Sequence, residues 1–379
     1  MSRSQALKTH AAVGVPSPQG CVPVARPLMP TLPAIAPYLE TLDANRWYTN
    51  FGPLVQALES RLTERFSRPT SVVTTTNGTQ ALTLALQALG AQPGGLCAMP
   101  SWTFAATAHA VLAAGLVPWF LDVDPVSGVL DADHVARRLA SSPGPVAAVL
   151  PVALFGQPFD YAPWIALQAK TGVPVLVDAA ASFDTLKAAP LPTMVSLHAT
   201  KLVSTGEGGL LASEDAALIH RVRKMTNFGF WGSREAQVSG GNAKLSEYAA
   251  AVGLASLDQW PSRRAALASR AQRLRAALVN APWIQFQPGW GLKWISSTCC
   301  VRVVDRDAAD LERRLADQGV ATRRWWGDGC HAQAAFTSCQ ADPLPATEAL
   351  ARTTLGLPFF ADMTHDEINR VSRAILDLS

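Results

Sequence analysis

Charge is scarce in this chain: Asp, Glu, Lys and Arg make up 16% of its 379 residues, where soluble domains average roughly 25%. The formal net charge at pH 7 is only +3, and the basic residues are scattered among acidic ones. A nucleic acid or an anionic membrane selects a dense basic patch, so we expect neither as a partner and favour small molecules. The 49% hydrophobic share predicts well-covered sheets and a buried contact between subunits, as in a homo-oligomer.

Cysteine spacings typical of metal sites and long hydrophobic runs are also missing. None of the six cysteines has a metal-ligand spacing, and the adjacent Cys299 and Cys300 would point to opposite faces of a strand. We therefore expect reduced thiols and no metal site. No stretch reaches ~20 uninterrupted apolar residues, and the first residues lack the apolar core of a signal peptide. The sequence predicts a cytoplasmic protein.

What the chain does contain is a regular alternation of short apolar runs and helical stretches. The strand-like runs lie at residues 71–76, 96–102, 117–123, 146–154, 173–180, 194–200 and 208–213. They are continuously apolar, which is typical of a mostly parallel sheet covered by helices on both faces. We predict an α/β fold whose ligands bind at the carboxyl ends of the strands.

The length of the chain favours one large and one small domain. Residues 1–30 are rich in Ser, Pro and Gly and predict a surface arm. Residues 31–260 would form the large domain, whose last helix, at about 245–260, is expected to end at Pro261. Residues 261–379 would form a smaller C-terminal α+β domain.

One lysine stands in a conspicuous place, in the stretch SLHATKLVSTGEGGLL. Lys201 follows a strand-like run and precedes a turn of small residues, so it would lie at the mouth of the sheet, where the backbone can approach a ligand closely. A lysine that forms a Schiff base needs such a place. An exposed loop lysine is the alternative interpretation of this stretch.

A carboxylate ends another strand-like run of the same series. Asp178 closes the run VPVLVD, and a carboxylate in a covered sheet is costly unless it pairs with a cation. The protonated pyridine nitrogen of pyridoxal 5′-phosphate (PLP) would serve, because the cofactor needs such a partner to act as an electron sink. A helix N-cap or turn aspartate is the alternative.

A phosphate site is predicted at TTTNGTQAL, where a strand runs into an apolar helix. The backbone N–H groups around Gly78 and the hydroxyl of Thr79 would converge at the helix N-terminus, although ordinary capping by Asn77 or Thr79 is the alternative. In PSWTFAAT, either Trp102 or Phe104 could cover a flat heterocycle, or simply pack against a helix.

Taken in order, these segments resemble the DegT-type (DegT/DnrJ/StrS) nucleotide-sugar aminotransferases, PLP enzymes of the aspartate-aminotransferase-like fold type I. The match includes RPLMP, RWYTNFGPLVQALESRL, NGTQAL, PSWTFAATAHAVLAAGLVPWFLDVD, VDAAASFD, SLHATKLVSTGEGG, GGNAKLSEYAAAVGL and LGLPFF. It covers nearly the whole chain, and its most specific motif is S-x-H-x-T-K followed by T-G-E-G-G. The resemblance implies that Lys201 binds the cofactor aldehyde and moves the proton between substrate and cofactor.

The resemblance also implies roles for the other candidates. Asp178 would hold the pyridine nitrogen and Phe104 would stack on the ring, while the phosphate would be bound by Gly78, Thr79 and Ser196. Asn242, in GGNAKLSE, would reach the phosphate of a neighbouring subunit, so that a homodimer shares its active sites. Tyr48 and His331 are the candidates for contact with the substrate, and a surface histidine is the alternative for His331.

Some positions depart from the family pattern. Ala181 stands where the family has Gln or His, so a polar contact near the cofactor is missing or comes from Ser182. The asparagine is followed by Ala243 and Lys244 rather than by Tyr and Arg. We expect His198 to pack or form hydrogen bonds.

The RRWW run at residues 323–326 could grip a nucleotide diphosphate and stack on its base, or form a solvated strand end.

The function implied by the resemblance is transfer of an amino group from glutamate to the keto group of a nucleotide-linked sugar. We favour a dTDP- or UDP-4-keto-6-deoxyhexose, in amino-sugar biosynthesis for surface polysaccharide (lipopolysaccharide O-antigen) or secondary metabolites. A 3-keto sugar or a keto-cyclitol would use the same residues. The sugar dehydratases of this fold have histidine in place of the lysine, so Lys201 argues against them. A regulatory protein that binds PLP without catalysis is the remaining alternative.

Overall fold

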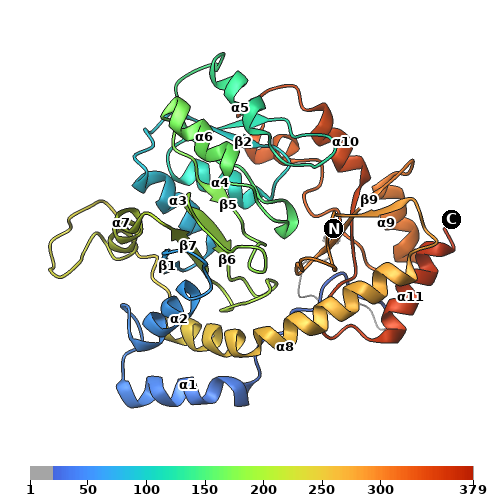
Figure 1. The fold of residues 1–379 in the computed structure, drawn as a ribbon, viewed down its shortest axis with the longest axis horizontal. Coiled ribbons are helices and arrows are strands. Elements are labelled where there is room, and N and C mark those ends of the chain that lie inside the picture. The colour runs from blue at the N-terminus through green and yellow to red at the C-terminus, as the bar shows by residue number, and fades with distance from the viewer. Residues whose placement is uncertain (1–19, 379) are drawn as a thin grey trace, which may run out of the picture.

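The computed structural model describes residues 20–378, so residues 1–19 of the predicted arm lie outside the described residues. A larger part built around one sheet and a smaller part near the C-terminus lie side by side, and the long helix α8 (Glu247–Ala277) runs along both (Figure 1). Among the described helices, none combines the length and the apolarity needed to cross a membrane.

The large sheet is mostly parallel, as the continuously apolar runs predict. Its main strands are β1 (Ser71–Thr75), β2 (Leu96–Pro100), β3 (Val117–Leu121), β4 (Val146–Val149), β5 (Val177–Asp178), β6 (Thr193–Ser196) and β7 (Gly209–Ser213). They pair in the orders β1-β7-β6-β5 and β10-β3-β2-β4, where β10 is the short strand Gln340–Ala341. Parallel bridges from Val149 to Val175 and from Val152 to Asp178 join the two sets. β7 runs antiparallel to both of its neighbours, β1 and β6.

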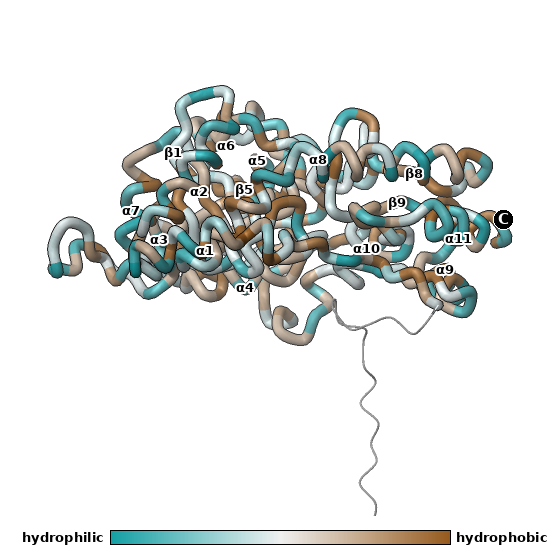
Figure 2. The backbone as a smooth tube through the Cα atoms, turned by 90° about the horizontal axis from the view of Figure 1, so that it is seen from below, coloured by the Kyte–Doolittle hydropathy of each residue, from teal (hydrophilic) through white to brown (hydrophobic). Residues whose placement is uncertain are grey.

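Helices cover both faces of this sheet because both faces are apolar. One face packs on α3 (Gly78–Ala88), α4 (Ala105–Ala113) and α7 (Ala216–Thr226). The other packs on α2 (Pro53–Thr63), α5 (Ala132–Leu139), α6 (Ala162–Thr171) and the first half of α8, with α1 (Leu32–Asn45) outside them along α8. Hydrophobic segments accordingly gather around β5, whereas many outer turns are hydrophilic (Figure 2).

The predicted helix end at Pro261 is wrong, because α8 continues through this proline to Ala277. Proline removes one N–H and crowds the preceding turn, but apolar side chains pack on both sides of it. Leu257 and Trp260 lie before Pro261 and Leu267 lies after it, all buried in the same core cluster. Tertiary packing therefore holds the helix together, and the predicted domain boundary near residue 260 falls inside α8.

The small part of the chain is α+β. Its antiparallel sheet contains β8 (Ile284–Phe286), β9 (Cys299–Val303) and β11 (Thr354–Leu357), and its helices are α9 (Ala308–Asp317), α10 (Pro345–Thr353) and α11 (His365–Leu376). Cys299 and Cys300 point to opposite sides of β9, as the sequence predicts, because they lie in different hydrophobic clusters. The N-terminal segment crosses this part: Val22 bonds to the backbone of Gly319, and Val24 accepts from Phe359.

Candidate active site

Lys201 lies in a closed loop just beyond the carboxyl end of β6. The backbone N–H of Ala199 bonds to Gly206 at 2.7 Å, and that of Lys201 bonds to His198 at 2.8 Å. Gly206 has φ +88°, a conformation that favours glycine. His198 has the hydrogen-bonding role predicted for it: its Nδ1 lies 2.9 Å from the hydroxyl of Thr200. The turn of small residues thus fixes the backbone from which the lysine side chain projects.

Asp178 ends β5, the strand that pairs with β6, and its carboxylate is buried. One carboxylate oxygen accepts a hydrogen bond from the hydroxyl of Thr107 at 2.8 Å, and the other accepts from the N–H of Ala180 at 3.0 Å. Burial raises the pKa of Asp178, and these two hydrogen bonds and the charge of Lys201 oppose that shift. A carboxylate held in this way favours a cation as its partner.

The lysine and the aspartate belong to one electrostatic site. Burial lowers the pKa of Lys201, and the neighbouring charge of Asp178 opposes that shift. A lowered pKa enlarges the neutral fraction of the amine, which is the form that can attack an aldehyde or accept a proton. The site therefore combines a nucleophilic base with a carboxylate that can stabilise a positively charged ring nitrogen.

The predicted phosphate site, or cradle, lies where α3 begins. Asn77 caps this helix, its side-chain oxygen accepting from the N–H of Gln80 at 2.8 Å, and Gly78 and Thr79 occupy the first turn, whose N–H groups have no partner within the helix. A Cβ at Gly78 would meet the sulfur of Met194 at 2.9 Å and Ser196 at 3.5 Å. Capping and phosphate binding, the two interpretations of this sequence, are therefore compatible, because the cap leaves the turn open.

Gly209 of β7 packs against the start of α3, and a substitution of this glycine tests whether the cradle binds the phosphate. A Cβ at Gly209 would lie 2.6 Å from the backbone of Asn77 and Gly78, so Gly209→Ala must push the start of α3 away. We expect the dissociation constant for PLP, measured by absorbance titration, to rise about 10-fold or more, since overpacking typically costs about 1–3 kcal/mol.

Gly144→Ala is the matched control, because a Cβ there would meet nothing closer than 3.7 Å, an ordinary contact. Equal affinity of both variants for PLP would show that the start of α3 does not bind the phosphate.

The two aromatic candidates beside the site differ in burial. Trp102 is buried and packs edge-on against Trp326, with ring centroids 5.2 Å apart. Phe104 is 60% exposed and is the N-cap residue of α4, one turn before the Thr107 that holds Asp178. Trp102 is thus committed to packing, and stacking of Phe104 on the cofactor ring stays a prediction.

Asn242 and Tyr48 do not line the cavity at Lys201 in their own chain. Asn242 is exposed, and the next residue, Ala243, accepts a backbone hydrogen bond from Thr76, beside the cradle. Tyr48 stacks on Tyr248 at the start of α8, with ring centroids 6.1 Å apart. The loop that carries Lys201 packs on α8 a few residues further along, where the N–H of Ser204 donates to the hydroxyl of Ser256 at 3.2 Å.

His331 reaches the carboxyl edge of the large sheet from the C-terminal part of the chain. Its ring Nδ1 lies 2.7 Å from the hydroxyl of Ser101, which directly follows β2. The backbone N–H of His331 donates to the same hydroxyl oxygen at 3.1 Å. The histidine is therefore anchored at the edge where ligands of parallel sheets bind, and its contact with substrate stays a prediction.

The RRWW run is used largely for packing. Trp326 stacks on Phe155, with centroids 4.1 Å apart, and Arg324 pairs with Asp328 at 3.0 Å. Ser182, the possible substitute for the family's Gln or His, has a buried hydroxyl without a hydrogen-bond partner. It lines a separate cavity of about 190 Å³ with Phe159 and Tyr161, among others, and that cavity does not include Lys201.

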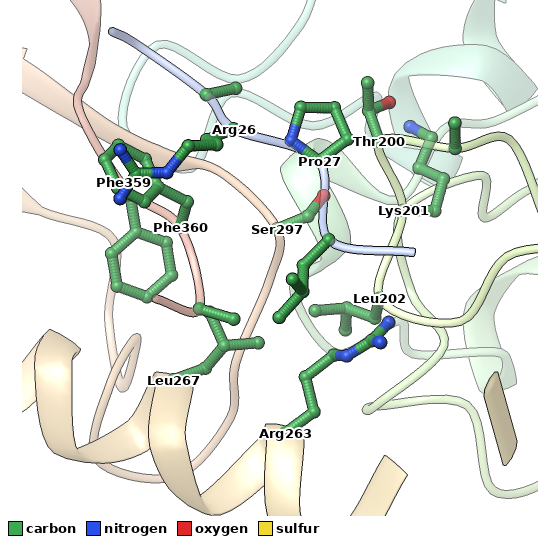
Figure 3. Close-up of a pocket in the computed structure, with 14 residues that line it drawn as sticks. Arg26, Pro27, Thr200, Lys201, Leu202, Arg263, Leu267, Ser297, Phe359 and Phe360 are labelled. Carbon is green, nitrogen blue, oxygen red and sulfur yellow. The ribbon is translucent and has the colours of Figure 1, made fainter. Parts of the chain in front are cut away.

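Two residues of the site were missed by sequence reasoning. Thr107 holds the carboxylate of Asp178, and a threonine inside an apolar helix gives only the weak signal of a polar group on a buried face. Arg263 lines the cavity at Lys201, which has a volume of about 40 Å³. Figure 3 shows its guanidinium extending from α8 toward Leu202.

These groups fit PLP. The first turn of α3 offers N–H groups to a phosphate, the buried carboxylate of Asp178 suits a pyridinium nitrogen, and the amine of Lys201, whose pKa is lowered by burial, suits an aldehyde. Comparison with solved structures places the fold in the class of PLP-dependent aminotransferases of fold type I. The chain belongs to the DegT/DnrJ/EryC1/StrS aminotransferase family, whose profile matches residues 33–376.

Relatives of the chain are similar over nearly its full length. It is 27% identical to a dTDP-4-amino-4,6-dideoxy-D-glucose transaminase of Escherichia coli, over 94% of this chain and 98% of that protein. The structure of DesI in the presence of its TDP-sugar product has a TM-score of 0.86 and 32% identity, covering 97% and 95% of the two chains. A putative PLP-dependent aminotransferase of Bacillus cereus has a TM-score of 0.87 and 27% identity, covering 94% and 99%.

Proposed function

We propose that the protein transfers the amino group of glutamate to the keto group of a nucleotide-linked sugar in the cytoplasm, with a dTDP- or UDP-4-keto-6-deoxyhexose as the favoured acceptor. The observation that carries amino transfer is the pairing of Lys201 with the buried carboxylate of Asp178, beside the cradle at α3. The sugar class is supported by the relatives, since one is named for a 4-amino-4,6-dideoxyglucose carried on dTDP and another was solved with a TDP-sugar product.

Each residue of the site has a defined task in this proposal. PLP, when bound, supplies an electron sink for the carbon that loses its proton. Lys201 accepts the α-proton of glutamate at Nζ and later returns a proton to the sugar carbon that receives the amine. Asp178 keeps the pyridine nitrogen protonated, Thr107 orients Asp178, and Gly78, Thr79 and Ser196 hold the phosphate. Phe104 covers the ring.

The active site is completed in this proposal by a second copy of the chain. The α8 helix links a large domain, residues 31–260, to a small one, residues 261–379, and the homodimer brings Asn242 of the partner subunit to the phosphate. His331, anchored to Ser101 at the carboxyl edge of β2, would contact the sugar. Tyr48, which stacks on Tyr248 at the start of α8, would also contact the sugar.

Mixing two inactive variants tests the shared site. We expect Lys201→Ala and Asn242→Ala, each much less active than wild type, to recover up to about a quarter of wild-type activity after joint unfolding and reassembly, because a mixed dimer has one site with both groups intact. Turnover of the mixture is the measurement. If activity stays at the level of the separate variants, although mixed dimers form, each site is made by one chain.

The reaction is tested in two stages with purified protein saturated with PLP. Adding glutamate should change the absorbance of the bound cofactor and release 2-oxoglutarate. Adding a panel of nucleotide keto-sugars should then restore the starting absorbance with one of them, and mass spectrometry and NMR of the product identify the aminated carbon.

The panel of nucleotide keto-sugars distinguishes the favoured acceptor from the alternative acceptors. A product aminated at C3, or one derived from a keto-cyclitol, would replace the favoured acceptor and leave amino transfer intact. A protein that binds PLP but responds to no amino donor would be a regulatory binder instead of an enzyme.

A further inference from the structure

Arg263 is a buried arginine whose charge has no acidic partner. It is 8% exposed, and its hydrogen bond is to the side-chain oxygen of Gln259 at 3.1 Å, one turn earlier in α8. No carboxylate of residues 20–378 lies within ion-pair distance of its guanidinium. Burial lowers the pKa of Arg263, and no neighbouring charge opposes that shift.

A second arginine of the same cavity shows the contrast. Arg26 also lines it, but it pairs with Asp362 at 3.2 Å and Glu367 at 3.1 Å, and it stacks on Phe360. Arg264, the next residue in α8, pairs with Asp184 at 2.6 Å. The chain therefore supplies anions to the arginines around Arg263 and leaves Arg263 without one. Burying a guanidinium in this way is costly unless an anion arrives from outside.

The surroundings of Arg263 favour binding of an anion. Leu28, Leu267 and Phe360 line the same cavity, and their apolar surfaces keep water away and strengthen a charge-assisted hydrogen bond.

We propose that Arg263 binds a carboxylate of the amino donor and so selects a dicarboxylic amino acid for the first half of the reaction. This inference rests on the proposed function, because it assumes that an amino acid enters the Lys201 cavity. Figure 3 shows the two elements involved: α8 carries the guanidinium, and the loop beyond β6 carries Lys201. Arginine suits this role because its planar fork matches the two oxygens of a carboxylate.

The test compares Arg263→Met with the wild-type protein, both saturated with PLP. Succinate, a dicarboxylate without an amino group, serves as an unreactive probe in calorimetry. We expect its dissociation constant to rise at least about 10-fold in Arg263→Met, as for loss of a hydrogen bond to a charged group. The KM for glutamate in the half-reaction should rise by a similar factor, and Arg263→Lys should fall between the two proteins.

Thermal stability distinguishes binding from a structural role. Methionine has nearly the volume of the arginine stem and carries no charge, so Arg263→Met should raise the melting temperature of the protein without substrate, by at least about 1 °C. An arginine needed for folding would give a lower melting temperature. A lower melting temperature together with unchanged succinate affinity would overturn the proposal.

Arg273→Met is the matched control, because Arg273 lies on the same helix and is exposed; it should leave the affinity for succinate unchanged. Titration with dTDP and UDP tests the other anion source. If Arg263→Met weakens nucleotide binding and leaves succinate binding intact, Arg263 holds a phosphate and the carboxylate proposal is wrong. If glutamate never changes the wild-type absorbance, the proposed function fails whatever Arg263 does.

Discussion

Lys201→Ala is expected to lower turnover by at least about 10⁴-fold, since proton transfer by a positioned base alone contributes up to ~10⁴, and this variant also loses the amine that bonds to the cofactor. Burial lowers the pKa of Lys201, which enlarges the fraction of the amine that can act as a base. The absorbance of the bound cofactor should change as well. Borohydride treatment followed by peptide mass analysis should find the cofactor joined to the Lys201 peptide in wild type and not in the variant.

Lys170→Ala is the control for this experiment. Lys170 is exposed near the end of α6, so its loss should change neither turnover nor the reduced-peptide mass. If Lys201→Ala remains active and carries the cofactor adduct on another lysine, the assignment of Lys201 is wrong.

Asp178→Asn should give the second large loss of activity. Asparagine has nearly the same shape and removes the charge, so a protonated pyridine nitrogen would lose its counter-ion. Since breaking a buried ion pair costs about 3–5 kcal/mol, we expect kcat to fall about 100-fold or more, while the melting temperature without cofactor is not lowered, because burial already disfavours the ionised carboxylate. Steady-state kinetics and thermal melts give the two quantities.

The control for Asp178 is Asp133→Asn, on the exposed face of α5. A wild-type kcat in Asp178→Asn would mean that the nitrogen needs no carboxylate. Loss of activity together with a collapsed melting temperature in that variant would indicate a structural role for the carboxylate instead.

The pairing of Asp178 and Lys201 could be predicted from the sequence because it follows from topology. Each residue comes after an apolar run of the strand type, and the carboxyl ends of parallel strands meet at one edge of a sheet. The start of α3 could be predicted for the same reason, since Asn77, Gly78 and Thr79 sit where a strand turns into a helix. These features depend on local pattern and on chain order, both of which a sequence displays.

Features that depend on distant packing could not be predicted. Pro261 is a local signal for a helix end, but buried side chains on both sides of it outweigh that signal. Because the predicted helix ended at Pro261, Arg263 was not assigned to any face of a helix. Thr107 contacts a residue 71 positions away in the chain, and nothing local distinguishes it from other helical threonines. The pattern around Trp326 was compatible with nucleotide stacking, and only its contact with Phe155 shows packing.

Continuation of α8 through Pro261 leaves the helix one backbone hydrogen bond short at that turn, because proline has no N–H to donate. Leu257, Trp260 and Leu267 on the two sides of the proline are buried in one core cluster, so side-chain packing fixes the direction of the helix there. Arg263 lies two residues beyond the proline, and its position relative to Lys201 therefore depends on that packing.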